Sequence, residues 1–438
     1  MKFRRIALAV ALGAALGPAS AADLLAIYRD SQVSDPVYQS ARATYTATIE
    51  KVPQARSAYL PLIAGSASAF RNDIDREIAG SIGYNTTVYA ITLSQPIFRM
   101  QSWIAIDQAK QQVIQAEATL AGAQQDLILR VAQAYFDVLL AQDNVALSET
   151  QNNAISEQLA QAKRNFEVGT ATIVDTLEAQ ARYDQTVAKS ISDKNDLEVK
   201  KSALQVLIGK LPDGLTPLRE PLTLGAPKPN DIEAWVKASQ DSSYAVASAR
   251  ANYEIFVQEI GRQRAGHLPT LDLTGNFARA SNPQSAVPGA VGAISNAGVI
   301  GLQLSVPIYS GGLIQSRVRE AVANRDRAQQ DLDNTQRGVA QAVRTNFFNV
   351  TSGIAQVRAL EQALASTQSQ LDSTILGRDV GVRTSVDVLN AQQSVFQTRR
   401  DLQQARYNFL MSNLRLKAAA GILTETDLED VNRTLARG

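Results

Sequence analysis

Two long stretches of the chain, 101–166 and 313–376, contain no proline and only scattered glycine. Apolar residues in the first stretch recur at steps of three and four, as along one face of a helix, while Ala and Gln dominate elsewhere. A helix of about 65 residues rises about 100 Å, which no compact globular domain of this size needs. The sequence therefore predicts two exceptionally long helices that pack lengthwise as coiled coils.

The two stretches belong to two similar halves of the chain. At an offset of about 210 residues, matches follow one another in the same order, which indicates a duplicated domain rather than a short-repeat solenoid. The best match places VGTATIVDTLEAQ (168–180) on VGVRTSVDVLNAQ (380–392). We therefore expect one structural repeat over 22–208, a second over 232–421, and a C-terminal segment over 422–438.

A segment with five prolines, 209–231, separates the repeats and is predicted to be a linker, because proline breaks helices. Each repeat reads as helix, strand, loop, strand, very long helix, tight turn and shorter helix. The strands are expected at about 61–71, 87–96, 270–280 and 297–307, the hairpin loops over 72–85 and 281–296, and the shorter helices over about 172–208 and 384–420.

The predicted strands alternate apolar and polar residues over about ten residues, the length that crosses a bilayer as a tilted strand. A half-buried soluble sheet has the same period, so alternation alone leaves both structures open. Four strands cannot close a membrane barrel, since bacterial barrels have eight or more. A membrane barrel would therefore need a dimer with eight strands or a trimer with twelve, and the small residues on one face favour the trimer and its open lumen.

Residues 1–21 have the features of a secretory signal peptide: a positively charged start, an apolar run and the small-residue cleavage site Ala19-Ser20-Ala21. Beyond it the sequence contains no apolar run long enough for a membrane helix. We therefore expect an exported chain without helical spans, for which a soluble periplasmic protein and a β-barrel both remain open.

The composition excludes most kinds of active site. The chain has no Cys and a single His, His267, which excludes thiol nucleophiles, thiolate metal sites, His-based triads and zinc triads. The formal net charge is +1, too small to attract nucleic acid. We expect no enzymatic activity, no cofactor, no metal site and no nucleic-acid partner, and a structural role for His267 at a helix-to-strand joint.

Three motifs, GHLPTLDLT (266–274), SVPIYSGG (305–312) and DVGVRTSVDVL (379–389), together with the duplicated architecture, resemble the TolC family of outer-membrane channel proteins. The resemblance covers almost the whole mature chain. It implies a homotrimer in the outer membrane of a Gram-negative bacterium, with a twelve-stranded membrane β-barrel continued by an α-helical barrel of coiled-coil helices in the periplasm. The linker would lie in the equatorial region of that helical barrel.

The resemblance further implies an exit duct of a tripartite export machine. Its partners would be outer-membrane lipid, a periplasmic adaptor (membrane fusion) protein and an inner-membrane transporter of the RND, MFS or ABC type. The cargo would be drugs and other small molecules or, alternatively, the unfolded proteins of a type I secretion system. From the residues alone, an exported coiled-coil structural or adaptor protein with a soluble sheet remains a second interpretation.

The best-matching motifs of the two halves contain the signals of a helix end, a tight turn and a new helix. A Gly in each fits the left-handed position after a helix C-terminus, and a Thr-x-x-Asp fits a capping box for the next helix. The turn residues are Gly169, Thr172, Gly381 and Thr384, and the capping carboxylates are Asp175 and Asp387. Capping alone would explain both carboxylates.

In the family these motifs form the periplasmic tip, and the resemblance implies that its closing contacts fall on Asp175 and Arg383. Arg383 has no counterpart in the first half, where Ala171 stands. An Arg at one tip that faces an Asp at the other would hold the coils together by charge-assisted hydrogen bonds. The family often has Tyr where this chain has Arg378. The Arg378 side chain either strengthens this lock by pairing with Asp175 or is simply solvated.

The resemblance also implies a ring of carboxylates that narrows the entrance and selects cations. Asp387 matches the first position of this ring, and Asn390 occupies the second. The ring should therefore carry less charge than is usual in the family and bind divalent cations less tightly. We expect block by divalent cations near Asp387 rather than a resident metal.

Overall fold

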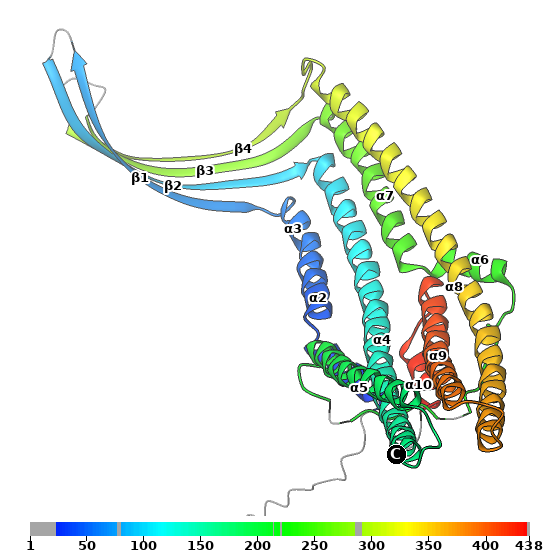
Figure 1. The fold of residues 1–438 in the computed structure, drawn as a ribbon. Helices are drawn as coiled ribbons and strands as arrows, with labels where there is room; N and C mark the ends of the chain where they lie inside the picture. Colours follow the sequence, from blue (N-terminus) through cyan, green and yellow to red (C-terminus); the bar gives the residue numbers. More distant parts are fainter. Residues whose placement is uncertain (1–22, 77–79, 213, 220, 285–290, 436–438) are drawn as a thin grey trace, which may run out of the picture. The chain divides into compact units, whose positions relative to one another are not determined.

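The structure, a computed structural model, describes residues 23–76, 80–212, 214–219, 221–284 and 291–435. The expected signal peptide lies outside these ranges. The chain divides into two compact units, and each takes segments from both halves of the sequence (Figure 1). Of the described residues, the first unit comprises those within 23–40, 123–243 and 339–435, and the second comprises those within 41–122 and 244–338. Among the described residues, no helix is both long enough and apolar enough to cross a membrane.

The second unit contains a four-stranded antiparallel sheet in the order β1-β2-β3-β4. Its strands are β1 (Leu62–Arg76), β2 (Gly80–Phe98), β3 (Thr270–Gln284) and β4 (Val291–Ser305). The central pair joins the two halves of the chain, with Leu93 of β2 opposite Gly275 of β3. The register shifts between Pro96 and Phe98, where a proline cannot donate to the ladder.

The prediction of hairpin loops over 72–85 and 281–296 is wrong, because the strands continue through most of both segments. Pairing extends to Arg76 and Gly80 in one hairpin and to Gln284 and Val291 in the other. Polar side chains support the extension: Asn72 Nδ2 donates to Thr86 Oγ1 across the ladder at 2.9 Å. An antiparallel ladder satisfies the backbone whatever the side-chain polarity, so the strands outrun the ten residues that a bilayer requires.

Much of the apolar surface of the sheet is exposed in the single chain. Ile300, Leu302 and Leu304 of β4 are 74%, 66% and 64% exposed, and Tyr89 and Ile91 of β2 are 59% and 56% exposed. Within the described ranges, β1 and β4 each pair with one strand only, which leaves two open edges. The sheet therefore presents both an apolar surface and unpaired backbone groups to its surroundings.

The helices of the second unit lead to and from the sheet (Figure 1). They are most of α2 (Pro36–Ile49), α3 (Lys51–Ser57), α7 (Tyr244–Arg264), the short η1 (Ala265–His267), and the first parts of α4 (Met100–Glu167) and α8 (Leu313–Asp379). Gln108 connects α4 to α7, because its Nε2 donates to the Ile255 carbonyl at 3.2 Å and to Glu259 Oε2 at 2.8 Å. His267 is the last residue of η1, and two residues separate it from β3, so it lies at the expected helix-to-strand joint.

The first unit contains the remaining parts of α4 and α8 with α1 (Leu24–Ser34), α5 (Ile173–Ile208), α6 (Ile232–Ser242), α9 (Ser385–Ala419) and α10 (Glu425–Asn432). Its core includes the fully buried Tyr28, Tyr135 and Phe136. The proline-rich segment packs on this core, since Leu215 and Leu222 are buried. The Tyr135 hydroxyl donates to the Thr216 carbonyl at 2.8 Å, and burial raises the pKa of Tyr135.

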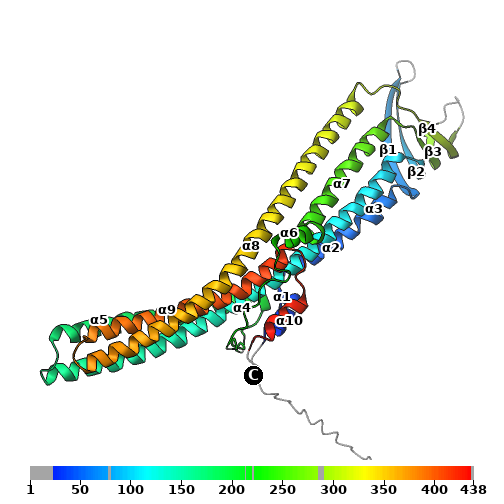
Figure 2. The same ribbon diagram turned by 90° about the vertical axis from the view of Figure 1, so that its right-hand side faces the viewer.

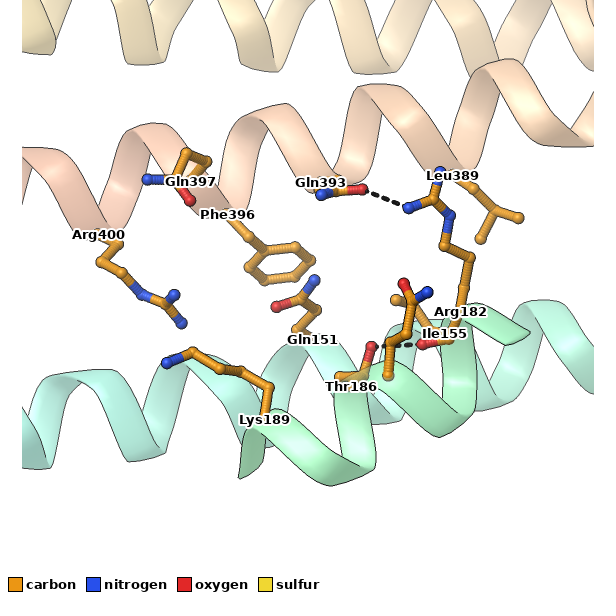
Figure 3. A pocket seen from close by; sticks show the side chains of 11 residues that line it. Gln151, Ile155, Arg182, Thr186, Lys189, Leu389, Gln393, Phe396, Gln397 and Arg400 are labelled. Carbon is orange, nitrogen blue, oxygen red and sulfur yellow. Dashed lines mark hydrogen bonds between the residues drawn. The ribbon is translucent and has the colours of Figure 1, made fainter. Parts of the chain in front are cut away.

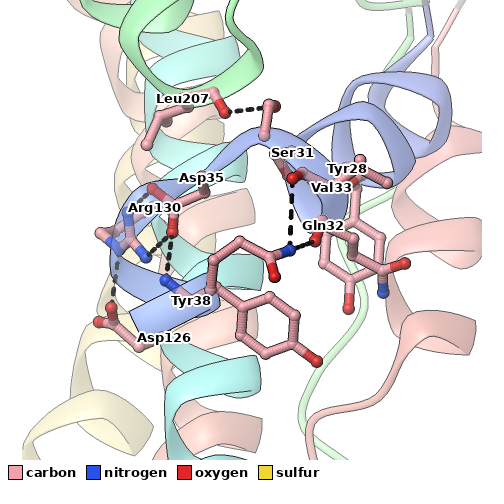
Figure 4. Close-up of polar contacts among 11 residues, drawn as sticks. Tyr28, Ser31, Gln32, Val33, Asp35, Tyr38, Asp126, Arg130 and Leu207 are labelled. Atoms are coloured by element: carbon pink, nitrogen blue, oxygen red, sulfur yellow. Dashed lines mark hydrogen bonds and ion pairs between the residues drawn. The ribbon is translucent and has the colours of Figure 1, made fainter. Parts of the chain in front are cut away.

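A buried ion pair fixes the junction between α1 and α2 (Figure 4). Asp35 is 2% exposed, and its Oδ2 accepts a hydrogen bond from the Tyr38 amide at 2.9 Å, which caps α2. Arg130 of α4 donates both Nη groups to the carboxylate at 3.1 and 2.8 Å. These bonds hold the pKa of Asp35 below its usual value, and Arg130 is shared with Asp126 at 2.7 Å.

Candidate functional site at the helix tips

The turns that join α4 to α5 and α8 to α9 lie together at one end of these four helices (Figure 2). Both turns have the same hydrogen bonds. Gly169 (φ 77°) donates to the Phe166 carbonyl at 3.0 Å, and Thr170 donates to the Asn165 carbonyl at 2.8 Å. Gly381 (φ 80°) and the next residue repeat the pattern at 3.0 and 2.9 Å. This is the Schellman motif, which requires a left-handed residue and so favours glycine.

Both expected capping boxes are confirmed. The Asp175 amide donates to Thr172 Oγ1 at 3.3 Å, and the Thr172 amide donates to Asp175 Oδ2 at 2.9 Å. The matching distances for Asp387 and Thr384 are 3.1 and 2.9 Å. The sequence thus folds into a sharp reversal twice, because each helix end and each helix start is satisfied locally.

Each capping carboxylate keeps one oxygen available. Thr172 donates to Oδ2 of Asp175, and Thr384 donates to Oδ2 of Asp387. No donor among the described residues contacts Oδ1 of either carboxylate. Hydrogen bonds from Thr384 hold the pKa of Asp387 below its ordinary value of 3.8, with a smaller contribution from the charge of Arg383. Asp387 therefore remains ionised at neutral pH, and a second role is compatible with the cap.

The three residues of the expected lock line one cavity of about 350 Å³ between the two tips. Within the described chain, however, no ion pair joins Asp175 to Arg383 or to Arg378. Arg378 instead donates Nε and Nη2 to Asp379 Oδ1 at 3.1 and 2.8 Å, and its side chain is 22% exposed. Arg378 is therefore neither paired with Asp175 nor simply solvated. Among the residues that the structure describes, no carboxylate forms an ion pair with Arg383.

The two expected ring positions, Asp387 and Asn390, line a second cavity of about 370 Å³ together with Arg383. Asn390 is not a free amide. Its Oδ1 accepts a hydrogen bond from Arg182 Nη2 of α5 at 3.0 Å. The other branch of the same guanidinium, Nη1, donates to Gln393 Oε1 at 2.9 Å (Figure 3).

Sequence reasoning missed Arg182, which links α5 to α9. It lines a cavity of about 180 Å³ with Lys189 and Arg400 (Figure 3). The signal that could have found it is the comparison that singled out Arg383: when the two motifs are aligned, Arg182 falls on Ser394. The described residues contain no group of His, Asp and Glu side chains that could hold a metal ion.

The sequence model of the outer membrane efflux protein family matches the chain twice, over 27–210 and 235–422. The chain belongs to this family. It is 35% identical to outer membrane protein TolC of Vibrio cholerae, with 97% of each chain covered. It is 29% identical to the alkaline protease secretion protein AprF of Pseudomonas aeruginosa, with 96% of this chain and 89% of AprF covered.

A solved structure of CusC has the same fold, with a TM-score of 0.80 at 18% identity and coverage of 91% of this chain and 92% of that one. Membership of the outer membrane efflux protein family places the protein in the outer membrane, from which it extends into the periplasm.

Proposed function

We propose that three copies of the chain form a closed twelve-stranded β-barrel in the outer membrane, continued by an α-helical barrel in the periplasm. The open edges of β1 and β4 support this assembly, because unpaired backbone groups are costly in lipid and closure removes them. The exposed apolar residues of β2 and β4 provide a surface for lipid. Two matches to one family sequence model support an internal duplication.

The assembled protein acts as the exit duct of an export machine. It takes drugs and other small molecules from an inner-membrane transporter of the RND, MFS or ABC type, through a periplasmic adaptor, to the outside. The similarity to TolC and to a cation efflux system protein named CusC, which is 25% identical over 67% of this chain, supports efflux. The similarity to a protease secretion protein over 96% of the chain supports type I secretion as a second function.

The helix tips form the closed end of this duct. Within the described part of each chain, no carboxylate forms an ion pair with Arg383 and no donor contacts Asp175 Oδ1. The two side chains are therefore available to pair between neighbouring copies. Arg378 holds Asp379 at the edge of the same cavity and adds charge to the lock. Several such pairs around a ring bias closure, although each exposed pair contributes only about 0.2–1 kcal/mol.

The entrance carries its negative charge on Asp387. The cap holds Asp387 in place through Oδ2 and keeps it ionised. Asn390 contributes no charge at the second position of the ring. Divalent cations therefore block at Asp387, and less tightly than at two successive rings of carboxylates.

The two capping boxes allow a matched experiment. Asp175→Asn and Asp387→Asn each remove one charge, and each keeps an oxygen that can accept the hydrogen bonds of a cap with nearly identical geometry. Asp175→Asn should raise the conductance of the trimer in a planar bilayer and leave block by periplasmic divalent cations unchanged. Asp387→Asn should weaken that block without opening the tip. Identical effects of the two substitutions would mean that both carboxylates are caps only.

A further inference from the structure

The side chain of Arg182 is half-buried between α5 and α9, but the two hydrogen bonds of its guanidinium are exposed. Within the described ranges the guanidinium has no carboxylate partner. It donates to two neutral amide oxygens, one on Asn390 and one on Gln393, at 3.0 and 2.9 Å. The other two cations that line this seam are compensated differently. The buried carboxylate of Asp193 accepts a hydrogen bond from Lys189 Nζ at 2.7 Å and lies 3.6 Å from Arg400 Nη2.

The position of this uncompensated charge is fixed by α9. Asn390 lies one helical turn after Asp387, and both line the cavity that Arg383 shares. The two parallel hydrogen bonds hold the planar guanidinium in one orientation, which a single donor would not do. The positive charge of Arg182 is therefore held in a fixed position next to Asn390, the second position of the entrance ring.

We propose that Arg182 is a selectivity-determining residue of the entrance, and this inference rests on the entrance proposed above. Its charge offsets that of Asp387, so the duct prefers cations only weakly and admits anionic cargo more readily than a ring with two carboxylates would. Asn390 contributes to the same effect, because its neutral amide oxygen binds Arg182 without cancelling the positive charge of the guanidinium.

Two substitutions separate the charge of Arg182 from its hydrogen bonds. Arg182→Gln removes the charge, and Arg182→Lys keeps it but loses the paired donors. Lys201→Gln is the control, since Lys201 lies on the same helix but is paired with Glu198 at 2.8 Å. The readout is the K⁺/Cl⁻ permeability ratio of the trimer, taken from the reversal potential across a planar bilayer with a salt gradient.

Arg182→Gln should raise the ratio by about threefold to fivefold at roughly 10 mM salt, and by much less at about 1 M, where the Debye length is short. Arg182→Lys and Lys201→Gln should stay close to the parent. An unchanged ratio for Arg182→Gln in a channel of normal conductance would overturn the inference and leave the proposed duct intact. A parent protein that never conducts would instead overturn the proposed duct.

A second variant keeps the inference falsifiable if Arg182→Gln fails to assemble. Asn390→Asp places a carboxylate against Arg182. The new carboxylate and the guanidinium form an ion pair, so the K⁺/Cl⁻ permeability ratio should rise by less than about twofold at low salt. Where Arg182→Gln does assemble, Asn390→Asp in that background should raise the ratio several-fold more than Asn390→Asp alone. A large rise from Asn390→Asp alone, or equal rises in both backgrounds, would show that Arg182 does not act on the entrance.

Discussion

Replacing Arg130 with Met should destabilise the first unit more than the loss of any exposed ion pair. The substitution keeps most of the aliphatic stem but leaves the carboxylate of Asp35, which is 2% exposed, with only the backbone of α2 as a partner. Breaking a buried pair on one side costs roughly 3–5 kcal/mol. The lower end applies here, because 29% of the Arg130 side chain is exposed and water screens that side of the pair.

The free energy of unfolding is measured by urea titration of the purified protein in detergent, with helical circular dichroism as the signal. Arg29→Met is the matched control, since Arg29 pairs with Glu425 across 3.3 Å and the two side chains are 62% and 38% exposed. It should cost less than about 1 kcal/mol. The double variant Asp35→Asn with Arg130→Met should recover part of the loss, because it removes the buried charge.

The same pair predicts a dependence on pH. Because the pKa of Asp35 is lowered in the folded state, its stabilisation is present above the ordinary value of 3.8 and is lost as pH falls through the lower folded-state value. Arg130→Met removes the largest cause of this lowering, so the pKa of Asp35 should be higher in the variant than in the parent. The deficit of the variant should therefore shrink as the medium is acidified. A cost equal to that of Arg29→Met, or a deficit independent of pH, would refute this account of the junction.

Three further predictions concern the tip and the core. Arg383→Ser should raise the open fraction in single-channel recordings, and unchanged conductance would remove Arg383 from the lock. Block by periplasmic divalent cations should persist as pH falls to the ordinary 3.8 of an aspartate and disappear only below it, because the pKa of Asp387 is lowered; loss of block well above that value would contradict the cap geometry. Gly421→Ala should lower the urea midpoint strongly, since φ is 75° and the new Cβ would lie 2.7 Å from Ser243 Cα; an unchanged midpoint would mean that the turn after α9 relaxes easily.

Local sequence signals predict the long helices and the tips closely. The proline-free stretch 101–166 lies within Met100–Glu167, and 313–376 lies within Leu313–Asp379. A left-handed glycine lies two residues after the end of each long helix, and the next helix begins at a Thr-x-x-Asp, because Schellman motifs and capping boxes depend only on neighbouring residues.

The features that sequence reasoning missed depend on pairing between distant segments. The hairpins run past the expected strand ends because a polar residue such as Asn72 finds a cross-strand partner that hydrophobic periodicity does not reveal. Arg182 was missed because its partners lie about 210 residues away on α9, and only packing brings the two helices together. Arg378 illustrates the opposite case, since the neighbouring Asp379 offered a nearer partner than Asp175.

The proposed duct is nearly closed, and acidic, at its periplasmic end. This proposal is tested by the conductance of the purified protein in a planar bilayer, with divalent cations added to each side in turn. We expect small conductance steps that divalent cations block from one side only. A protein that does not insert, or that conducts widely and is blocked equally from both sides, would contradict the account.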